Sequence, residues 1–399
     1  MPLRNAIGGV GLIASTAIGA AILALPVATA HLGFTYTALF FFVCWCFMTL
    51  GALYVLEANL AVGRGTNLIS MAEKTLGPWG KYFTWCVYLS LLYALVAAHL
   101  AGAGAWIHQE LSYFHLAPFN GAMLMTFIII IVILMGTFVI DWVNRLLLIG
   151  LISIFISLVF TTLPHVESSL LFSQPTVFDL RPIPIIITAF GSAIVIPSLT
   201  EYLRGSGRQL VWVVLGGSLI PLLVYVSWEF AIVGIIPMHG MPGLVEIQQH
   251  GHPVTDVPLA LQHLLHNVWI SRASSYFSIF ALTASFLGLC LSLIDFLADG
   301  LDIHKNIKGK LILIFIAFVP PLVFILFYPH GFTIILSLAG FFVALLLGVL
   351  PASMVWSARY RLTLPSNLQI IGGKFLLLLT ITFFIIVIGI ESYNQWQML

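Results

Sequence analysis

The sequence predicts an all-α integral membrane protein with eleven spanning helices, arranged as a five-plus-five inverted repeat with one further helix. The chain has 399 residues, of which 61% are hydrophobic and only 7% are charged, whereas a soluble domain carries about 25% charged residues. Eleven apolar segments are long enough to cross a bilayer. Two of them, five spans apart, contain the same glycine-then-proline interruption.

Each predicted span is a segment of about 20 mostly apolar residues, the length that crosses the hydrocarbon core of a bilayer. The segments between spans are too short for a separate soluble domain, so we expect a single transmembrane domain over 1–399. Spans one to five occupy about 5–164, spans six to ten about 181–351, and the eleventh about 374–391. In order, the spans are expected at about 5–30, 36–62, 81–110, 121–140, 142–164, 181–202, 209–237, 273–298, 310–328, 332–351 and 374–391.

Lysine and arginine predict the orientation, because they favour the cytoplasmic side of a membrane. With the N-terminus in the cytoplasm, 13 of the 15 Lys and Arg residues lie inside, and only Arg181 and Arg272 lie outside. With a wrong number of spans, the Lys and Arg residues would be divided between the two sides of the membrane. We therefore expect a cytoplasmic N-terminus and a C-terminus on the outside. The inside residues are Arg4, Arg64, Lys74, Lys81, Arg145, Arg204, Arg208, Lys305, Lys308, Lys310, Arg359, Arg361 and Lys374.

The first and sixth spans carry the matching interruptions. One reads IGAAILALP at Ile18–Pro26, and the other reads FGSAIVIPS at Phe190–Ser198. In lipid, a broken helix exposes backbone groups at high cost unless protein or a water-filled cavity satisfies them. Matched breaks in oppositely directed spans are typical of the binding site of secondary transporters. The alternative is that the glycines only let helices pack closely.

The two breaks predict an amino acid as the ligand. Freed N–H groups at the start of a half-helix suit a carboxylate, and freed carbonyls suit a cation or an ammonium group. We assign the backbone of Gly19 and Ala20 to the carboxylate, and the carbonyls near Ser15 and Thr16 to the ammonium. The expected break residues are Ser15, Thr16, Ala17, Ile18, Gly19 and Ala20 in the first span, and Phe190, Gly191, Ser192 and Ala193 in the sixth.

Two ionisable residues lie at membrane depth and are candidate proton carriers. His99 is near the middle of the third span, and Glu229 is eight residues from the outer end of the seventh. Intramembrane ionisable residues are functional candidates by default. The alternative is a neutral His99 bonded to a backbone carbonyl, and a neutral Glu229 bonded to a neighbouring helix. Tyr93 lies on a different face from His99, and we expect it to serve packing.

Acidic residues also lie near the expected cytoplasmic ends of two spans. They are Glu57 in the second span and the pair Asp295 and Asp299 in the eighth. These carboxylates either pair with an inside Arg or Lys at a cytoplasmic gate or simply anchor the helix ends.

The expected outer loop, 238–271, is rich in histidine. H-x-H and H-x-x-H spacings are compatible with metal binding, but no cysteine or acidic cluster supports a metal site. The stretch DVPLALQHLLHN instead predicts a short amphipathic lid helix. The histidines are His239, His250, His252, His263 and His266.

Several stretches resemble the hydroxy and aromatic amino acid permeases of the amino acid-polyamine-organocation superfamily. They are STAIGAAILALP, YALVAAHLAGAG, DWVNR, TASFLGLCLSLIDFLADGL and FYPHGF. The resemblance covers nearly the whole chain. It implies the leucine-transporter-type fold and proton-coupled uptake of an aromatic amino acid, with tyrosine first and phenylalanine or tryptophan as alternatives.

The resemblance also implies roles for particular residues. It places Phe190 at the pocket wall, where its ring would stack on the substrate. It places Thr283 and Ser285 where this fold can hold a sodium ion, against carbonyls near Ala14 and Ala17. The alternative is that Thr283 and Ser285 only cap backbone carbonyls within their own helix.

The chain departs from the family pattern at three places. Ser192 and Ala193 stand where an aromatic residue and a histidine are expected, which leaves tyrosine, phenylalanine and tryptophan unresolved. Leu151 stands where a lysine is expected, and a lysine amine can replace a bound sodium by charge. His99 stands where a tyrosine is expected, so it is a candidate for the missing imidazole. These departures keep sodium coupling open beside proton coupling.

The sequence therefore predicts a secondary active symporter that imports an aromatic amino acid across a bacterial-type inner membrane. The expected partners are the amino acid and the lipid bilayer, with no nucleic acid, no obligate protein partner, no organic cofactor and no resident metal. We find no G-x-x-x-x-G-K-[ST] loop for ATP, and no HExxH or G-x-S-x-G motif for an intramembrane enzyme. A channel is a further alternative, but it would not require matched broken helices.

Overall fold

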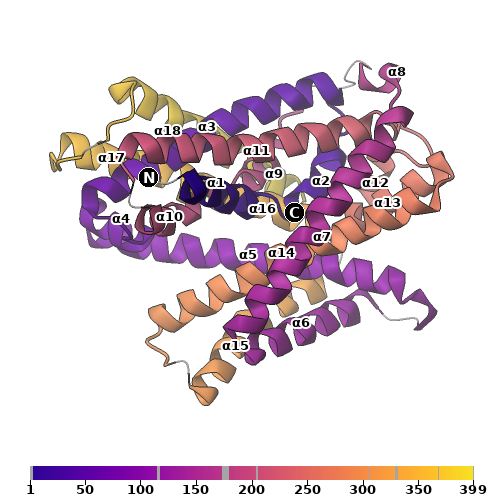
Figure 1. Cartoon of the computed structure of the whole chain (residues 1–399), viewed down its shortest axis with the longest axis horizontal. Helices are drawn as coiled ribbons and strands as arrows, with labels where there is room; N and C mark the ends of the chain where they lie inside the picture. The colour runs from indigo at the N-terminus through magenta and orange to yellow at the C-terminus, as the bar shows by residue number, and fades with distance from the viewer. Residues whose placement is uncertain are drawn as a thin grey trace.

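The computed structural model is helical throughout the described residues, which are 3–114, 117–172, 179–203, 205–304, 306–328, 331–366 and 368–398. Several long helices run along one axis, and α7 crosses them obliquely (Figure 1). The helices are α1 (Leu3–Ala17), α2 (Ala21–Ala28), α3 (Gly33–Val62), α4 (Leu68–Leu76), α5 (Pro78–Glu110), α6 (Pro118–Met135), α7 (Thr137–Thr162), α8 (Ser168–Leu171), α9 (Ile183–Ala189), α10 (Ile196–Leu203), α11 (Gly207–Val233), α12 (Leu244–His250), α13 (Pro253–Leu265), α14 (Val268–Gly300), α15 (Ile307–Phe327), α16 (Phe332–Val343), α17 (Leu350–Tyr360) and α18 (Gly373–Met398).

The number of spans agrees with the sequence prediction. Ten helical segments of the described chain are long and apolar enough to cross a membrane, and the bent pair α1–α2 makes an eleventh. α9 and α10 together form the sixth span, and α16 and α17 form the tenth. The spans that consist of one helix each are α3, α5, α6, α7, α11, α14, α15 and α18.

Both predicted interruptions are present. The first span is broken at residues 18–20, where the axes of α1 and α2 differ by 55°. The sixth span is interrupted after α9, and a 3₁₀ turn at Ser192–Val195 leads into α10. The glycine-then-proline pattern therefore located both breaks.

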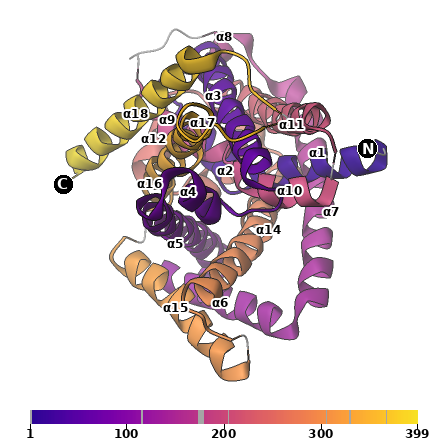
Figure 2. The ribbon, with the colours of Figure 1, turned by 90° about the vertical axis from the view of Figure 1, so that its left-hand side faces the viewer.

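The outer halves of the predicted first and sixth spans, α2 and α9, lie near the middle of the bundle, and α1 runs from there to its edge (Figure 2). α2 packs on α9, α1 packs on the 3₁₀ turn of the sixth span, and α11 packs on both halves of the first span. α3 and α16 flank α9. The irregular backbone is thus enclosed by protein, as it must be at membrane depth.

The boundary between the fourth and fifth spans lies earlier than expected. α6 ends at Met135 and α7 begins at Thr137, whereas the apolar pattern placed the boundary at 140–142. Gly136 between them has a φ of +100°, a conformation that favours glycine. Because the apolar run continues through this turn, hydropathy does not mark it, and the DWVNR stretch lies inside α7.

The tenth span is longer than expected and runs past Pro351. A π-helical turn at Ala344–Val349 precedes this proline, and α17 continues to Tyr360. A proline normally ends a helix because it lacks an N–H and clashes with the preceding turn. The wider turn accommodates it here, so the span does not end at the proline.

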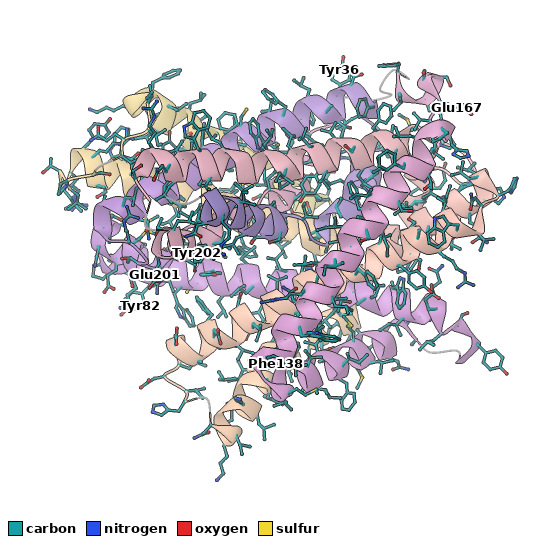
Figure 3. All side chains as sticks on the ribbon, in the orientation of Figure 1. Tyr36, Tyr82, Phe138, Glu167, Glu201 and Tyr202 are labelled. Carbon is teal, nitrogen blue, oxygen red and sulfur yellow. The ribbon has the colours of Figure 1, made fainter. Side chains whose placement is uncertain are left out.

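The outer side of the bundle is apolar, as lipid contact requires. Phe138 on α7, Trp212 on α11 and Phe375 on α18 are 84%, 67% and 75% exposed. Figure 3 shows Tyr36, Tyr82 and Phe138 projecting away from the bundle.

The segment between the seventh and eighth spans contains the two short helices α12 and α13, so the expected short helix is present, and its role as a lid stays a prediction. His239 lies 3.8 Å from Glu246, and His250 lies 3.2 Å from Asp256. The described residues contain no group of three or more side chains that could hold a metal ion. Arg204, Lys305 and residues 329–330 of the FYPHGF stretch lie outside the described residues.

Candidate functional site

The break of the first span leaves backbone groups without helix partners. The Ile18 N–H donates to the Ala14 carbonyl at 3.0 Å and closes the last turn of α1. Within the described residues, the N–H groups of Gly19 and Ala20 donate to no backbone carbonyl. They lie at the N-terminus of α2, where the helix dipole adds positive partial charge. This backbone suits an anionic group such as a carboxylate.

The side chains of Ser15 and Thr16 do not take part in the break. Both residues are exposed, and their hydroxyls donate to the Leu12 carbonyl at 3.2 and 2.7 Å. Any contribution of these residues to a ligand would therefore come from their backbone. Their carbonyls stay a prediction as ammonium ligands.

A tyrosine of the seventh span joins the two breaks. The Tyr225 hydroxyl oxygen lies 2.7 Å from the Ala17 carbonyl oxygen and 2.8 Å from the Ala189 carbonyl oxygen. These are the last residues of α1 and of α9. Tyr225 is fully buried, and its ring meets the Phe190 ring edge-on with centroids 5.2 Å apart.

The third and eighth spans meet beside the first break. The His99 Nε2 lies 2.8 Å from the Ser285 hydroxyl oxygen, and the His99 Nδ1 lies 2.7 Å from the Leu95 carbonyl. The Ser285 hydroxyl also lies 2.6 Å from the Ala281 carbonyl. A Cβ at Gly19 would lie 3.1 Å from the Ser285 Cβ. His99, Ser285 and the break of the first span are therefore contiguous.

Three of the four residues predicted for a sodium site have other partners in this conformation. The Ala14 carbonyl accepts from Ile18, the Ala17 carbonyl accepts from Tyr225, and Ser285 faces His99. Thr283 is half-buried. It is two residues from Ser285, about 200° around the helix, so the two side chains leave on different faces. The sodium site stays a prediction.

The break of the sixth span borders a small cavity. Ser192 and Ala193 are buried, and Ala17, Phe190 and Ser192 line the cavity together with Trp45, Met48, Thr49, Ala52, Ser218 and Pro221. Its volume is about 10 Å³, roughly the room for one water molecule. A Cβ at Gly191 would lie 3.1 Å from the Thr188 carbonyl oxygen. An aromatic side chain would enter here only if the surrounding helices moved apart.

Glu229 is buried one helical turn beyond Tyr225. One carboxyl oxygen accepts from the Thr29 hydroxyl at 2.6 Å, and Thr29 follows the last residue of α2. The other carboxyl oxygen has no hydrogen-bond partner among the described residues. Burying a carboxylate with so little compensation is costly, which favours the protonated acid. Glu229 thus connects the seventh span to the second half of the first.

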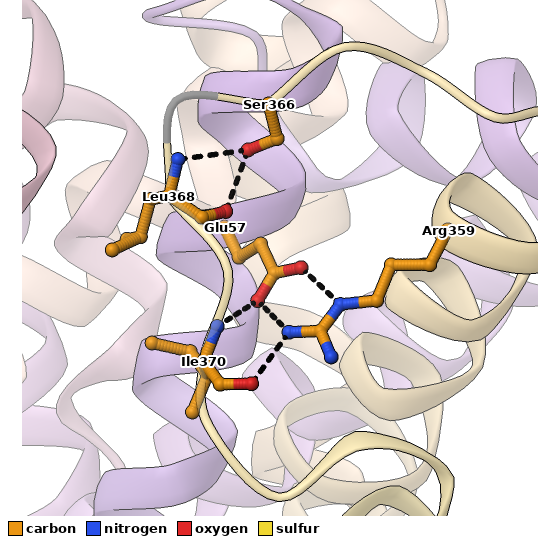
Figure 4. Close-up of polar contacts among 5 residues, drawn as sticks. All are labelled: Glu57, Arg359, Ser366, Leu368 and Ile370. Carbon is orange, nitrogen blue, oxygen red and sulfur yellow. Dashed lines mark hydrogen bonds and ion pairs between the residues drawn. The ribbon is translucent and has the colours of Figure 1, made fainter.

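A polar cluster ties the predicted inner ends of the second and tenth spans (Figure 4). The Arg359 guanidinium donates two hydrogen bonds to the Glu57 carboxylate, and both side chains are buried. The Ile370 N–H donates to the same carboxylate at 2.9 Å, and the Ile370 carbonyl accepts from Arg359 at 2.9 Å. The expected pairing of Glu57 with an inside arginine is present. Asp295 and Asp299 are both exposed.

The predicted outer end of the sixth span is held by a second ion pair. Arg181 lies 2.8 Å from the Asp179 carboxylate, and its N–H also donates to that carboxylate at 2.9 Å. Burial alone would raise the pKa of Asp179, but these hydrogen bonds and the positive charge outweigh it and lower the pKa. The Arg181 carbonyl accepts from Asn394 of α18 at 3.3 Å. The eleventh span is thereby joined to the start of the sixth.

The sequence had pointed to the break residues, His99, Ser285 and Glu229, but it did not point to Tyr225. A tyrosine in an apolar helix carries no signature of a bridging role, and its partners are carbonyls of two distant segments. The spacing of Tyr225 and Glu229, four residues apart on one helix face, is the only signal that was available.

Known proteins match this chain over nearly its whole length. The model of the tryptophan/tyrosine permease family matches residues 3–391. A tyrosine-specific transport system 2 of Haemophilus influenzae is 32% identical, and the match covers 98% of this chain and 96% of that protein. A tryptophan-specific transport protein of the same species is 27% identical over 94% and 93% of the two chains. A glutamine transporter 2 of Aliivibrio fischeri is 28% identical over 94% and 96%.

Solved structures share the fold. A mutant manganese transporter of Eremococcus coleocola superposes with a TM-score of 0.68, and the match covers 97% of this chain and 85% of that protein. The two sequences are 12% identical, so the likeness concerns the fold alone. The leucine-transporter-type fold, with five-plus-five spans and one addition, is confirmed.

Proposed function

Because the chain belongs to the tryptophan/tyrosine permease family, we propose that it imports an aromatic amino acid by proton-coupled symport. The family consists of multi-pass membrane permeases, which move their substrates without altering them. Two of the relatives described above are specific for tyrosine or tryptophan. Tyrosine is the preferred substrate in this proposal, with phenylalanine and tryptophan next.

The backbone at the two breaks supports an amino acid as the substrate. The unpartnered N–H groups of Gly19 and Ala20 are donors for its carboxylate. The carbonyls of Ala17 and Ala189 end two half-helices, where the helix dipoles place negative partial charge, and they are acceptors for its ammonium group. Phe190 follows Ala189 and lines the small cavity together with Ala17, so it is the candidate aromatic face for a substrate ring.

The main support for proton coupling is that His99 contacts Ser285, which in turn lies beside Gly19 in the break of the first span. Neutral His99 donates its Nδ1–H to Leu95, because a carbonyl only accepts. The single Ser285 proton must then serve either His99 Nε2 or a carbonyl of its own helix, Ala281 at 2.6 Å or Leu282 at 3.2 Å, so two donors serve four contacts. When His99 is protonated, its Nε2–H can donate to the Ser285 hydroxyl, whose own proton then serves the Ala281 carbonyl. In our proposal, protonation of His99 therefore changes the Ser285 contacts beside the break of the first span.

Glu229 is the second residue that we propose as a carrier of the coupling proton. Its carboxyl group accepts one hydrogen bond, from Thr29, and its other oxygen is unpartnered within the described chain. Glu391 is a buried acid of the eleventh span that differs in this respect. Ser337, Asn394 and Gln395 all donate to its carboxylate, which stabilises the charged form. Of the two acids, Glu229 is therefore the proton carrier in our proposal.

Sodium coupling remains the alternative, because the family lysine is absent at Leu151. In that mechanism, sodium would bind Thr283, Ser285 and the carbonyls near Ala14 and Ala17 after these groups gave up their present partners. The glutamine transporter among the relatives supports a second alternative, in which the substrate is another neutral amino acid.

We further propose that the chain forms a single transmembrane domain in a bacterial-type inner membrane, with its N-terminus in the cytoplasm and its C-terminus outside. The distribution of Lys and Arg along the sequence supports this orientation. Under it, the Glu57–Arg359 cluster lies on the cytoplasmic side.

Counterflow in proteoliposomes tests the transport proposal. Vesicles loaded with unlabelled tyrosine, phenylalanine, tryptophan or glutamine are diluted into labelled tyrosine. A carrier specific for aromatic amino acids accumulates label transiently with the three aromatic amino acids inside and not with glutamine. A channel or an enzyme gives no overshoot, and an overshoot with glutamine alone would contradict the aromatic substrate.

A further inference from the structure

The position of Tyr225 is unusual because two helix ends point at one hydroxyl group. The Ala17 and Ala189 carbonyls are the last of α1 and of α9, and their oxygens lie 2.7 and 2.8 Å from the Tyr225 oxygen. Each helix end carries about half a negative charge from the backbone dipoles. The site is fully buried, so water does not screen the repulsion between the two ends.

A phenol has one proton, but two carbonyls require a donor here. Tyr225 therefore holds one carbonyl with a full hydrogen bond while the other remains short of a donor. An unpaired buried carbonyl carries a desolvation cost, and an incoming N–H donor removes it. The arrangement holds both helix ends in place and still leaves one acceptor for a ligand.

We propose that Tyr225 is a positioning residue that sets the spacing of the two breaks and so determines the affinity for the ammonium group of the substrate. This inference rests on the proposed function, in which that ammonium binds the two carbonyls. The Tyr225 ring contributes packing against Phe190, and the hydroxyl contributes the bridge. Removal of the hydroxyl alone isolates the second contribution.

Tyr93 offers a matched control. Its hydroxyl also donates to a backbone carbonyl, that of Ile316, at 2.9 Å. This carbonyl lies four residues before Pro320, which has no N–H to donate to it. Tyr93 thus satisfies one carbonyl in one helix, away from both breaks. Its loss should affect stability and not ligand binding.

The experiment compares Tyr225→Phe with Tyr93→Phe in counterflow and in competition with the deaminated analogue of tyrosine. Tyr225→Phe should raise the apparent KM for tyrosine about tenfold, the effect of one good hydrogen bond, while Tyr93→Phe stays within about twofold. Inhibition by the deaminated analogue, which has no ammonium group, should stay as in the wild type. A merely structural role would weaken both ligands together.

An unchanged KM in Tyr225→Phe, or a parallel loss of tyrosine and analogue binding, would overturn the inference. A wild type that exchanges no aromatic amino acid would instead refute the proposed function. Tyr225→Gln covers the case in which the phenylalanine variant does not fold. Its uncharged amide keeps hydrogen-bond donors at this position, but the side chain is shorter than tyrosine and does not reach both carbonyls, so tyrosine affinity should again fall while inhibition by the analogue stays as in the wild type. Wild-type tyrosine affinity in the glutamine variant would equally contradict the role of the hydroxyl bridge.

Discussion

At the scale of single residues, the proposed proton coupling rests on His99 and Glu229. His99→Gln or Glu229→Gln should abolish tyrosine accumulation driven by a pH gradient in proteoliposomes. Each variant should retain exchange at equal pH, because exchange requires no net movement of protons. Glutamine keeps the size of the glutamate side chain and an acceptor for Thr29, but it does not titrate.

Glu391→Gln is the matched control for these two variants. Glu391 is also buried, yet three donors serve its carboxylate. We expect it to keep pH-driven accumulation, measured in the same vesicles. Accumulation that survives both His99→Gln and Glu229→Gln would speak against the proton carriers proposed here.

Candidate functional residues could be predicted from the sequence where an ionisable side chain lies in an apolar span. His99 and Glu229 stand out in apolar helices because an ionisable group there is costly, and the structure places each beside the first span. Tyr225 and Thr29 were not assigned roles, and Arg359 was not singled out among the inside cations as the partner of Glu57. Their partners come from segments far away in the chain, and one sequence does not show which carbonyls a helix break will turn toward them.

At the scale of elements, the two glycines of the broken spans should be essential for binding. Gly19→Leu places its side chain against Ser285, since a Cβ alone would lie 3.1 Å from the Ser285 Cβ. Gly191→Leu would crowd the Thr188 carbonyl. We expect both variants to lose tyrosine binding in an equilibrium binding measurement while they retain normal elution from size-exclusion chromatography.

Gly11→Leu is the control in the same span as Gly19, within α1. A Cβ at Gly11 would meet no atom within 4 Å, and leucine is a better helix former than glycine. This variant should bind tyrosine as the wild type does. Wild-type binding by Gly19→Leu and Gly191→Leu as well would mean that these glycines serve only helix packing.

The Glu57–Arg359 cluster makes a prediction about how the inner helix ends are held together. Glu57→Gln leaves a buried arginine without its counter-ion, which should destabilise the protein by about 3–5 kcal/mol. Glu73→Gln removes the exposed pair with Lys81, whose side chains are both 44% exposed, and should cost about 0–1 kcal/mol. Thermal unfolding in detergent compares the two variants, and equal melting temperatures would contradict this role of the buried pair.

Helix breaks and ends could be predicted where the residue composition changes along the chain, but not within a uniform apolar run. Glycine followed by proline marked both broken spans, because both residues weaken a helix. Gly136 ends α6 within a continuous apolar run, so the same reasoning missed that turn. The apolar pattern placed the end of the tenth span at 351, but the helix continues beyond Pro351 after a π-helical turn.

At the scale of the whole molecule, the orientation in the membrane is a separate prediction. The excess of Lys and Arg on one side predicts a cytoplasmic N-terminus and an outside C-terminus. A reporter that is active only in the cytoplasm should be silent when fused after Leu399 and active when fused to the N-terminus. Activity at the C-terminus would imply an even number of spans and would undo the five-plus-five arrangement.

The number of spans and the repeat were predictable because length, hydropathy and charge alternation all constrain the same count. The size of the binding site was not predictable. The cavity beside Phe190 and Ser192 holds about 10 Å³, which is too small for an amino acid, so the helices around it would have to move apart to admit one. The cavity size depends on how remote helices pack, and a single sequence carries no direct signal of it.

The most direct test of proton-coupled aromatic amino acid import is accumulation in proteoliposomes under a pH gradient alone. Vesicles without sodium, acidic outside and neutral inside, receive labelled tyrosine. The proposed mechanism predicts accumulation above the external concentration that collapses when a protonophore is added. Accumulation that requires sodium and ignores the pH gradient would contradict it and would make Thr283 and Ser285 the next residues to change.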